Sequence, residues 1–130
     1  MGAHRLVDTA IQGGDRVLAL FPDFDLYGLR RVLRLALFQA FDGSSGEYEY
    51  LLEIDAEYTD VRGFVTLQFG GVKGVTLPQM MPSFYFAELE IDDVSRDQLE
   101  GIRFRAKDHG MTEFEVLCKT VAIRWHAELE

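Results

Sequence analysis

The 130-residue sequence lacks several features that mark particular protein classes. It contains one cysteine, Cys118, so an internal disulfide is impossible and no oxidising compartment is implied. No apolar run of signal-peptide length opens the chain, because charged residues such as Arg5, Asp8 and Asp15 interrupt it. No stretch approaches the roughly 18 uninterrupted apolar residues of a membrane-spanning helix. These absences predict a cytoplasmic protein with no membrane partner.

Motifs for metal, phosphate or cofactor binding are also missing. The histidines His4, His109 and His126 are dispersed, and none has a second histidine or cysteine at metal-ligand spacing. Neither the GxGxxG nor the GKS/T phosphate-binding fingerprint occurs. Asp92-Asp93 is not followed by a loop with ligands at every second position, and Cys118 has no histidine near it in sequence. The sequence therefore predicts no catalytic residue, no metal site and no cofactor.

The formal net charge of −9 lies entirely in the later part of the chain. Residues 1–46 contain five acids and five bases, whereas residues 47–130 contain the other 17 of the 22 acids and 8 of the 13 bases. An acidic balance disfavours nucleic acids and anionic membranes, and it favours either a basic protein partner or simple solubility. Hydrophobic residues at 48% and charged residues at 27% are typical of globular proteins, so we expect a single domain over residues 1–130.

The clearest pattern is a two-residue alternation over residues 47–58, EYEYLLEIDAEY. Successive side chains of a β-strand point to opposite faces, so this pattern predicts a long antiparallel strand with one apolar face and one acidic face. The apolar face is expected in a core and the acidic face in water. The predicted inward residues are Tyr48, Tyr50, Leu52, Ile54, Ala56 and Tyr58.

A helix is predicted before this strand, within residues 4–21, where apolar side chains recur at helical spacing. Pro22 disfavours helical geometry at the residue before it and so ends the helix. Gly13-Gly14 interrupts the middle of the segment. Either one bent helix persists, or a second short helix begins near Asp15, whose carboxylate suits a helix N-terminus.

The remaining segments predict further strands. Residues 29–41 fit a helix or a strand, but the loop DGSSG at residues 42–46 favours a strand that forms a hairpin with 47–58. Other strands are predicted at residues 64–69, 72–77, 84–94, 102–107 and 113–125, with a parity slip near Lys119 that suggests a bulge or bend. The expected fold is α+β, with an N-terminal helix packed on an antiparallel, meander-like sheet of about seven strands.

The outward acids of the alternating strand are the main candidates for a partner-binding surface. They offer a row of carboxylates to a cationic protein, although the same row could serve only to prevent aggregation. Arg30 and Arg34, on the neighbouring strand, are the expected counter-charges. The predicted partner-binding residues are Glu47, Glu49, Glu53, Asp55, Glu57 and Asp60.

A basic row formed by Arg103, Arg105 and Lys107 invites a nucleic-acid interpretation. Glu113 and Glu115 follow a short Asp-His-Gly turn and are expected on the same face of the next strand. Cross-strand pairs of opposite charge then account for the basic row, so we expect no nucleic-acid partner.

Two groups of aromatic residues leave other functions open. Phe24, Tyr27, Phe84 and Phe86 could line the pocket of a small enzyme or a ligand-binding β-rich domain. The apolar cluster from Met80 to Phe86 could instead be the contact surface of a homo-oligomeric structural protein. A deep cavity with inward polar groups would favour the first alternative, and a filled core would disfavour it.

Several stretches taken together resemble a known family. They are residues 21–25 (FPDFD), 67–72 (LQFGGV), 89–94 (LEIDDV) and 99–104 (LEGIRF), followed by a hairpin that carries Asp108 and Cys118. The arrangement covers most of residues 20–120 and resembles small bacterial domains grouped with the immunity proteins of polymorphic toxin systems. The resemblance implies a cytoplasmic protein that neutralises a cognate toxin by binding it, and it supplies no catalytic residues.

The acidic charge and this resemblance lead to the same expectation. We expect a non-enzymatic, immunity-like inhibitor whose partner is a cognate toxin or another basic protein, for example a nuclease. An acidic surface can cover a cationic active site and accelerate the encounter by electrostatic steering.

Overall fold

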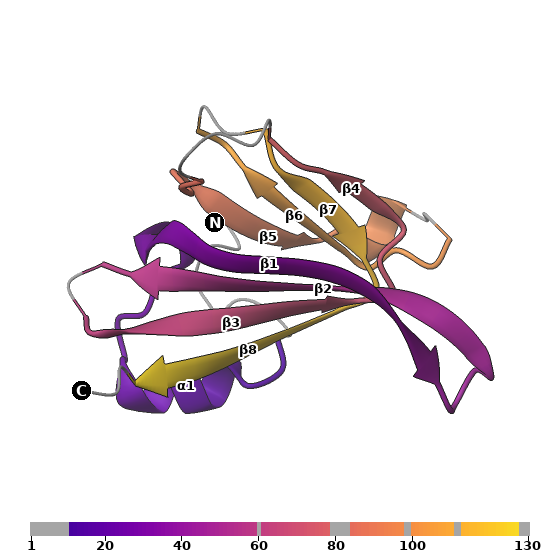
Figure 1. The fold of residues 1–130 in the computed structure, drawn as a ribbon, viewed down its shortest axis with the longest axis horizontal. Coiled ribbons are helices and arrows are strands. Elements are labelled where there is room, and N and C mark those ends of the chain that lie inside the picture. Colours follow the sequence, from indigo (N-terminus) through magenta and orange to yellow (C-terminus); the bar gives the residue numbers. More distant parts are fainter. Residues whose placement is uncertain (1–10, 60, 79–83, 98–99, 111–112, 128–130) are drawn as a thin grey trace.

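The computed structural model describes residues 11–59, 61–78, 84–97, 100–110 and 113–127. These residues form one short helix and eight strands in two sheets, so the fold is α+β and mostly β (Figure 1). The elements are α1 (Gly14–Leu20), β1 (Leu29–Asp42), β2 (Glu47–Tyr58), β3 (Gly63–Gly70), β4 (Gly74–Thr76), β5 (Leu89–Asp93), β6 (Phe104–Asp108), β7 (Glu115–Cys118) and β8 (Thr120–Ala127).

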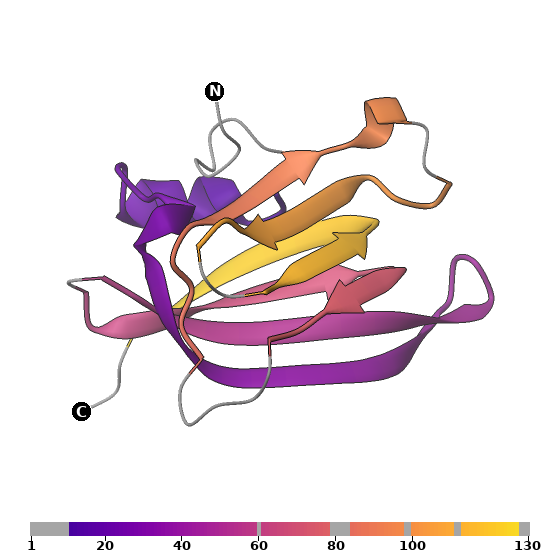
Figure 2. The same ribbon diagram turned by 90° about the horizontal axis from the view of Figure 1, so that it is seen from above.

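The first sheet has the strand order β1-β2-β3-β8, and the second has the order β4-β7-β6-β5. All neighbouring strands in both sheets are antiparallel. Figures 1 and 2 show the second sheet packed across one face of the first. The prediction of antiparallel strands is therefore confirmed, but the prediction of about seven strands in a single meander is wrong.

The parity slip near Lys119 marks the point where the chain changes sheets. Phe114 and Val116 are buried at even positions, whereas Val121 and Ile123 are buried at odd positions. β7 belongs to the second sheet, and β8, two residues after it, belongs to the first. The predicted strand over residues 113–125 is thus two strands that serve different sheets.

The core lies between the two sheets. From the first sheet, Leu52, Ile54 and Leu67 are completely buried, and from the second sheet Ile91 and Phe104 are buried against them. All five belong to one hydrophobic cluster. Burying each such side chain contributes roughly 1.5–3 kcal/mol to stability, so the region between the sheets dominates the folding free energy.

The helix is shorter than the segment predicted at residues 4–21, of which residues 4–10 lie outside the described part. Gly13 precedes α1 with φ +83°, and a Cβ atom there would lie 2.3 Å from the carbonyl oxygen of Ile123. The alternative of a short helix beginning near Asp15 is therefore confirmed. α1 packs against β8, and its seven residues are far too few to cross a membrane; no other described helix could do so.

Residues 29–41 are a strand, as the hairpin loop predicted. β1 and β2 have 14 and 12 residues, whereas the other strands have 3 to 8. Because these two strands are longer, their hairpin end projects beyond the second sheet (Figure 1). We call residues 36–51 the hairpin arm.

Candidate protein-binding surface

The predicted acidic row lies on the outer face of the first sheet, away from the core. Glu53 is paired with Gln68 and Asp55 with Thr66 on the adjacent strand β3. Glu47, at the end of the hairpin arm, is exposed. The acidic row therefore lies on the face of the strand directed away from the core, as the alternation predicts. The predicted contact Asp60 lies outside the described residues.

In the middle of this face the acids are paired with arginines of β1. Arg31 Nε lies 2.9 Å from Glu57 Oε1, and Arg34 lies 3.2 Å from Glu53 and 3.7 Å from Asp55. The predicted counter-charge Arg34 is confirmed. Opposite charges neutralise this part of the face, and each exposed pair contributes about 0–1 kcal/mol to stability.

The prediction that Arg30 belongs to this counter-row is wrong. Its guanidinium donates to the backbone carbonyls of Tyr27 and Ala87 instead. The register of β1 against β2 shifts between Leu29 and Val32 and again before Arg34. These shifts break the simple alternation, so Arg31 rather than Arg30 reaches the acidic face with Arg34.

A hydrogen-bond network extends from the paired acids across β3 to β8. Thr66 Oγ1 donates to Asp55 at 2.7 Å and lies 2.9 Å from His126 Nε2. The imidazole of His126 also stacks on Phe64, with ring centroids 4.6 Å apart. Gln68 donates to Glu53 at 2.9 Å. The centre of the outer face is therefore an ordered polar surface whose carboxylates already have partners.

At the end of the hairpin arm, carboxylates of like charge come together. Asp42 is directly opposite Glu47 in the register, and Glu49 lies two residues further along the same face. Hydrogen bonds from Ser44 lower the pKa of the Asp42 carboxyl. The described ion pair there joins Lys119 Nζ to Glu49 at 3.6 Å. Like charges directly opposite each other destabilise a hairpin, so folding gains nothing from this arrangement.

Aromatic side chains accompany these acids on the other face of the arm. Phe41 is 60% exposed, Tyr48 69% and Tyr50 49%. The rings of Phe41 and Tyr48 meet edge to face, with centroids 5.4 Å apart. The prediction that Tyr48 and Tyr50 lie in the core is wrong, because the second sheet does not cover the arm. Residues of this kind are enriched at protein interfaces.

The basic row lies in the second sheet with acidic neighbours on both sides. Lys107 is opposite Glu115 on β7 and opposite Glu90 on β5. Arg105 is opposite Asp92. Glu115 is therefore on the same face as the basic row, as predicted; Glu113 precedes β7 and is exposed. Cross-strand charge complementarity accounts for these bases.

Three of the four aromatic residues predicted to line a pocket, Phe24, Phe84 and Phe86, are packed against other rings. Phe24 and Phe86 are 3% and 2% exposed. Phe24 stacks on Tyr58 with centroids 4.5 Å apart, and Phe86 meets Phe84 edge to face at 5.3 Å. These residues fill the core rather than open a cavity. Of the predicted oligomer cluster, residues 80–83 lie outside the described part of the chain.

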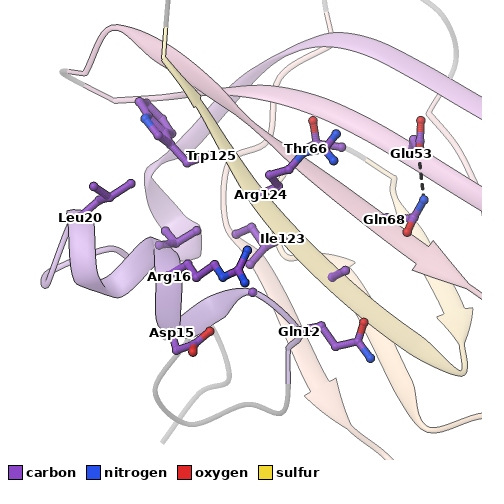
Figure 3. A pocket seen from close by; sticks show the side chains of 13 residues that line it. Gln12, Asp15, Arg16, Leu20, Glu53, Thr66, Gln68, Ile123, Arg124 and Trp125 are labelled. Carbon is purple, nitrogen blue, oxygen red and sulfur yellow. Dashed lines mark hydrogen bonds between the residues drawn. The ribbon is translucent and has the colours of Figure 1, made fainter.

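An open groove of about 670 Å³ lies elsewhere, between α1 and the outer face of β8 (Figure 3). Leu20 and Trp125 form its apolar end, and Arg16 and Arg124 extend along it. Arg124 Nε lies 3.2 Å from His126 Nε2, and the acids of the groove include the paired Glu53. Thr66 also lines the groove, and its hydroxyl, which lies 2.9 Å from His126 Nε2, donates to the Asp55 carboxylate.

Two described groups, Cys118 and Tyr27, have strongly raised pKa values. Burial raises the pKa of the Cys118 thiol to about 12, which leaves it protonated and inert. The hydroxyl of Tyr27 donates to Glu90, and this bond raises the Tyr27 pKa to about 12. His109 Nε2 lies 3.0 Å from the same carboxylate. Within the described ranges, no three histidine, cysteine or acidic residues gather as a metal site.

Sequence reasoning missed Arg31 and the exposure of Phe41, Tyr48 and Tyr50. Arg31 could not be found because a register shift has no signature in a single sequence. For the aromatic residues a signal was available. The predicted hairpin strands, at residues 29–41 and 47–58, are about twice as long as those predicted at 64–69, 72–77 and 102–107, and two long strands that pair with short ones must project at one end.

Comparison with known proteins identifies the family. Residues 27–124 match the model of the family described as Immunity protein PIM8. The match includes all strands from β1 to β7 and the first five of the eight residues of β8. No curated protein and no solved structure matched. The matched range covers well over half of the chain, and the protein therefore belongs to the PIM8 family of immunity proteins.

Proposed function

We propose that this protein neutralises a cognate toxin by binding it, without catalysis, and that the end of the hairpin arm is the contact surface. Family membership supports a toxin-neutralising role. The observation that supports the location is the combination of exposed Tyr48 and Tyr50 on one face with Glu47 and Glu49 on the other. A projecting hairpin is suited to entering a concave site on a partner.

The chemistry of the arm favours a cationic toxin. Tyrosine supplies a large, rigid contact area with a polar hydroxyl group, and it is common among the residues that dominate binding energy. Carboxylates around such anchors steer a positively charged protein and accelerate its association. A cytoplasmic toxin that acts on a polyanion, such as a nuclease, has the required positive active site.

The six predicted contacts should not contribute equally. Glu47 and Glu49 lie at the arm end, where Glu49 contacts Lys119 at 3.6 Å and Glu47 has no ion pair among the described residues. Glu53, Asp55 and Glu57 already pair with Arg31 and Arg34. A toxin that used these paired acids would first have to displace the arginines. We therefore assign the main electrostatic role to Glu47 and Glu49, with Asp60 as a further predicted contact.

The test uses the product of the neighbouring gene, the expected cognate toxin, and measures association rates at two ionic strengths. The variant E47K/E49K should associate at least tenfold more slowly at low salt, and the wild-type rate should fall as salt is added. The matched control is E100K/E113K, which changes the net charge equally at exposed positions outside the arm. Equal losses in both double variants would mean that overall charge, not the arm, drives the encounter.

A further inference from the structure

β1 is an edge strand, and only part of its outer side is hydrogen-bonded to another segment. The Val32 amide donates to the carbonyl of Phe84 at 2.8 Å, and the Arg30 carbonyl accepts from the amide of Phe86 at 2.8 Å. Beyond Val32, the outer side of β1 has no backbone hydrogen-bond partner among the described residues. The strand nevertheless continues to Asp42. An open strand edge of this length is a template for pairing with another strand.

Among the described residues, this edge has little of the usual protection against pairing. The segment from Leu35 to Asp42, LALFQAFD, contains no lysine and no proline. The register shifts of β1 lie before it. Leu37 is 48% exposed, Phe38 39% and Phe41 60%, so apolar side chains stand open on both faces. Such an edge is expected to be covered in the functional state.

The backbone groups that point outward can be identified from the hairpin loop. The carbonyl of Asp42 accepts the amide of Gly46, so the backbone of Asp42 points into the hairpin. The register is regular from Arg34 to Asp42. Because peptide groups alternate along a strand, the amides and carbonyls of Leu35, Leu37, Gln39 and Phe41 point to the free edge.

We infer that this edge pairs with the same edge of a second copy, antiparallel, across a two-fold axis at Phe38. In this register Leu35 is opposite Phe41 of the other copy and Leu37 is opposite Gln39. All four residues point outward, so the pairing forms about eight hydrogen bonds, two for each hydrogen-bonded pair. The same surface serves both copies, as a two-fold dimer requires.

The charged residues favour this pairing register over those in which the axis is moved by one residue. With the axis at Phe38, Arg34 of each copy is opposite Asp42 of the other, on the outer face. Moving the axis to Leu37 or Gln39 preserves the hydrogen bonds but leaves Asp42 without this partner. The exposed Phe38 rings meet at the axis, and Phe41 gains Leu35 of the other copy as a neighbour. A second copy therefore complements the edge in hydrogen bonding, apolar contact and charge.

Sedimentation of the purified protein tests the dimer without a toxin. A failure of the dimer inference can therefore be distinguished from a failure of the proposed toxin binding. Over a hundredfold range of micromolar concentrations, the mass should rise to twice 14.8 kDa. The variant F38D places two carboxylates at the axis and should remain a monomer. The control Y48D introduces the same charge at another exposed aromatic residue of the arm, away from the β1 edge, and should still dimerise. Circular dichroism confirms that both variants fold.

Oxidative cross-linking tests the register. F38C should form a disulfide with itself, whereas A36C and A40C should cross-link efficiently only when mixed, because positions 36 and 40 are opposite each other. Buried Cys118 does not compete. A wild-type protein that stays monomeric, or a dimer in which F38C fails to cross-link, would overturn the inference. So would a monomer whose residues 35–42 become protected from hydrogen exchange only when the toxin is added, since the toxin would then occupy the edge.

Discussion

The two halves of the β1–β2 hairpin share one sequence pattern but lie in different surroundings. Beside the second sheet, Leu52, Ile54 and Ala56 are completely buried. In the hairpin arm, Tyr48 and Tyr50 occupy the same face of the same strand and are 69% and 49% exposed. The difference lies in what covers the strand, because the second sheet ends before the arm begins.

This contrast separates the parts of the hairpin that fold the protein from the part that is available for binding. Apolar side chains between the sheets contribute to stability by leaving water. Aromatic side chains that remain exposed in the arm contribute little to the stability of the fold. They lie beside carboxylates that repel each other. Substitutions in the arm should therefore affect partners, and substitutions in the covered half should affect folding.

The largest expected difference between the halves is in stability. Ile54→Ala should reduce the free energy of unfolding by roughly 2–5 kcal/mol, the usual range for truncating a buried large aliphatic side chain. Tyr50→Ala, four residues earlier on the same face, should reduce it by less than about 1 kcal/mol because the side chain is half exposed. Urea unfolding curves measure both. Similar losses of stability at the two positions would show that the arm is covered in solution. The proposed difference between the two halves of the hairpin would then be wrong.

A smaller effect concerns pH at the tip of the arm. Hydrogen bonds from Ser44 lower the pKa of Asp42 below its ordinary 3.8. A depressed carboxyl pKa stabilises the folded turn above the ordinary value, and this contribution is lost as the pH falls through the lowered pKa. The pKa can be measured from the carboxyl carbon by NMR titration. Ser44→Ala should raise it toward 3.8, and Ser45→Ala should raise it less; an unchanged value in Ser44→Ala would contradict the turn geometry.

Much of the fold could be predicted from the sequence, because local patterns report local structure. The alternation of residues 47–58 predicted the buried Leu52 and Ile54 and the outward Glu53. The parity slip near Lys119 predicted a bulge or bend at the point where the structure divides the segment into two strands. Periodicity reports which face a side chain occupies. It does not report what lies above that face, and this explains the misplaced tyrosines and the unpredicted second sheet.

The charge pairing was predicted only in part, for a related reason. Arg34 was correctly placed because its register with β2 is regular. Arg31 was missed because the two register shifts before it depend on how the strand fits its neighbours, including the segment around Phe84 that bonds to Val32. No local pattern encodes these contacts. Because the acids in the middle of the row are paired with arginines, the candidate surface is the exposed end of the row rather than its middle.

The most direct test of the central claim compares toxin affinity for two double variants of the same hairpin. Y48A/Y50A removes the exposed aromatic residues of the arm, whereas R31A/E57A removes a paired base and acid together from the covered half and keeps the net charge. We predict that Y48A/Y50A raises the Kd for the cognate toxin at least tenfold, about 1.4 kcal/mol, and that R31A/E57A leaves it nearly unchanged. An unchanged Kd for Y48A/Y50A with a large increase for R31A/E57A would contradict the account.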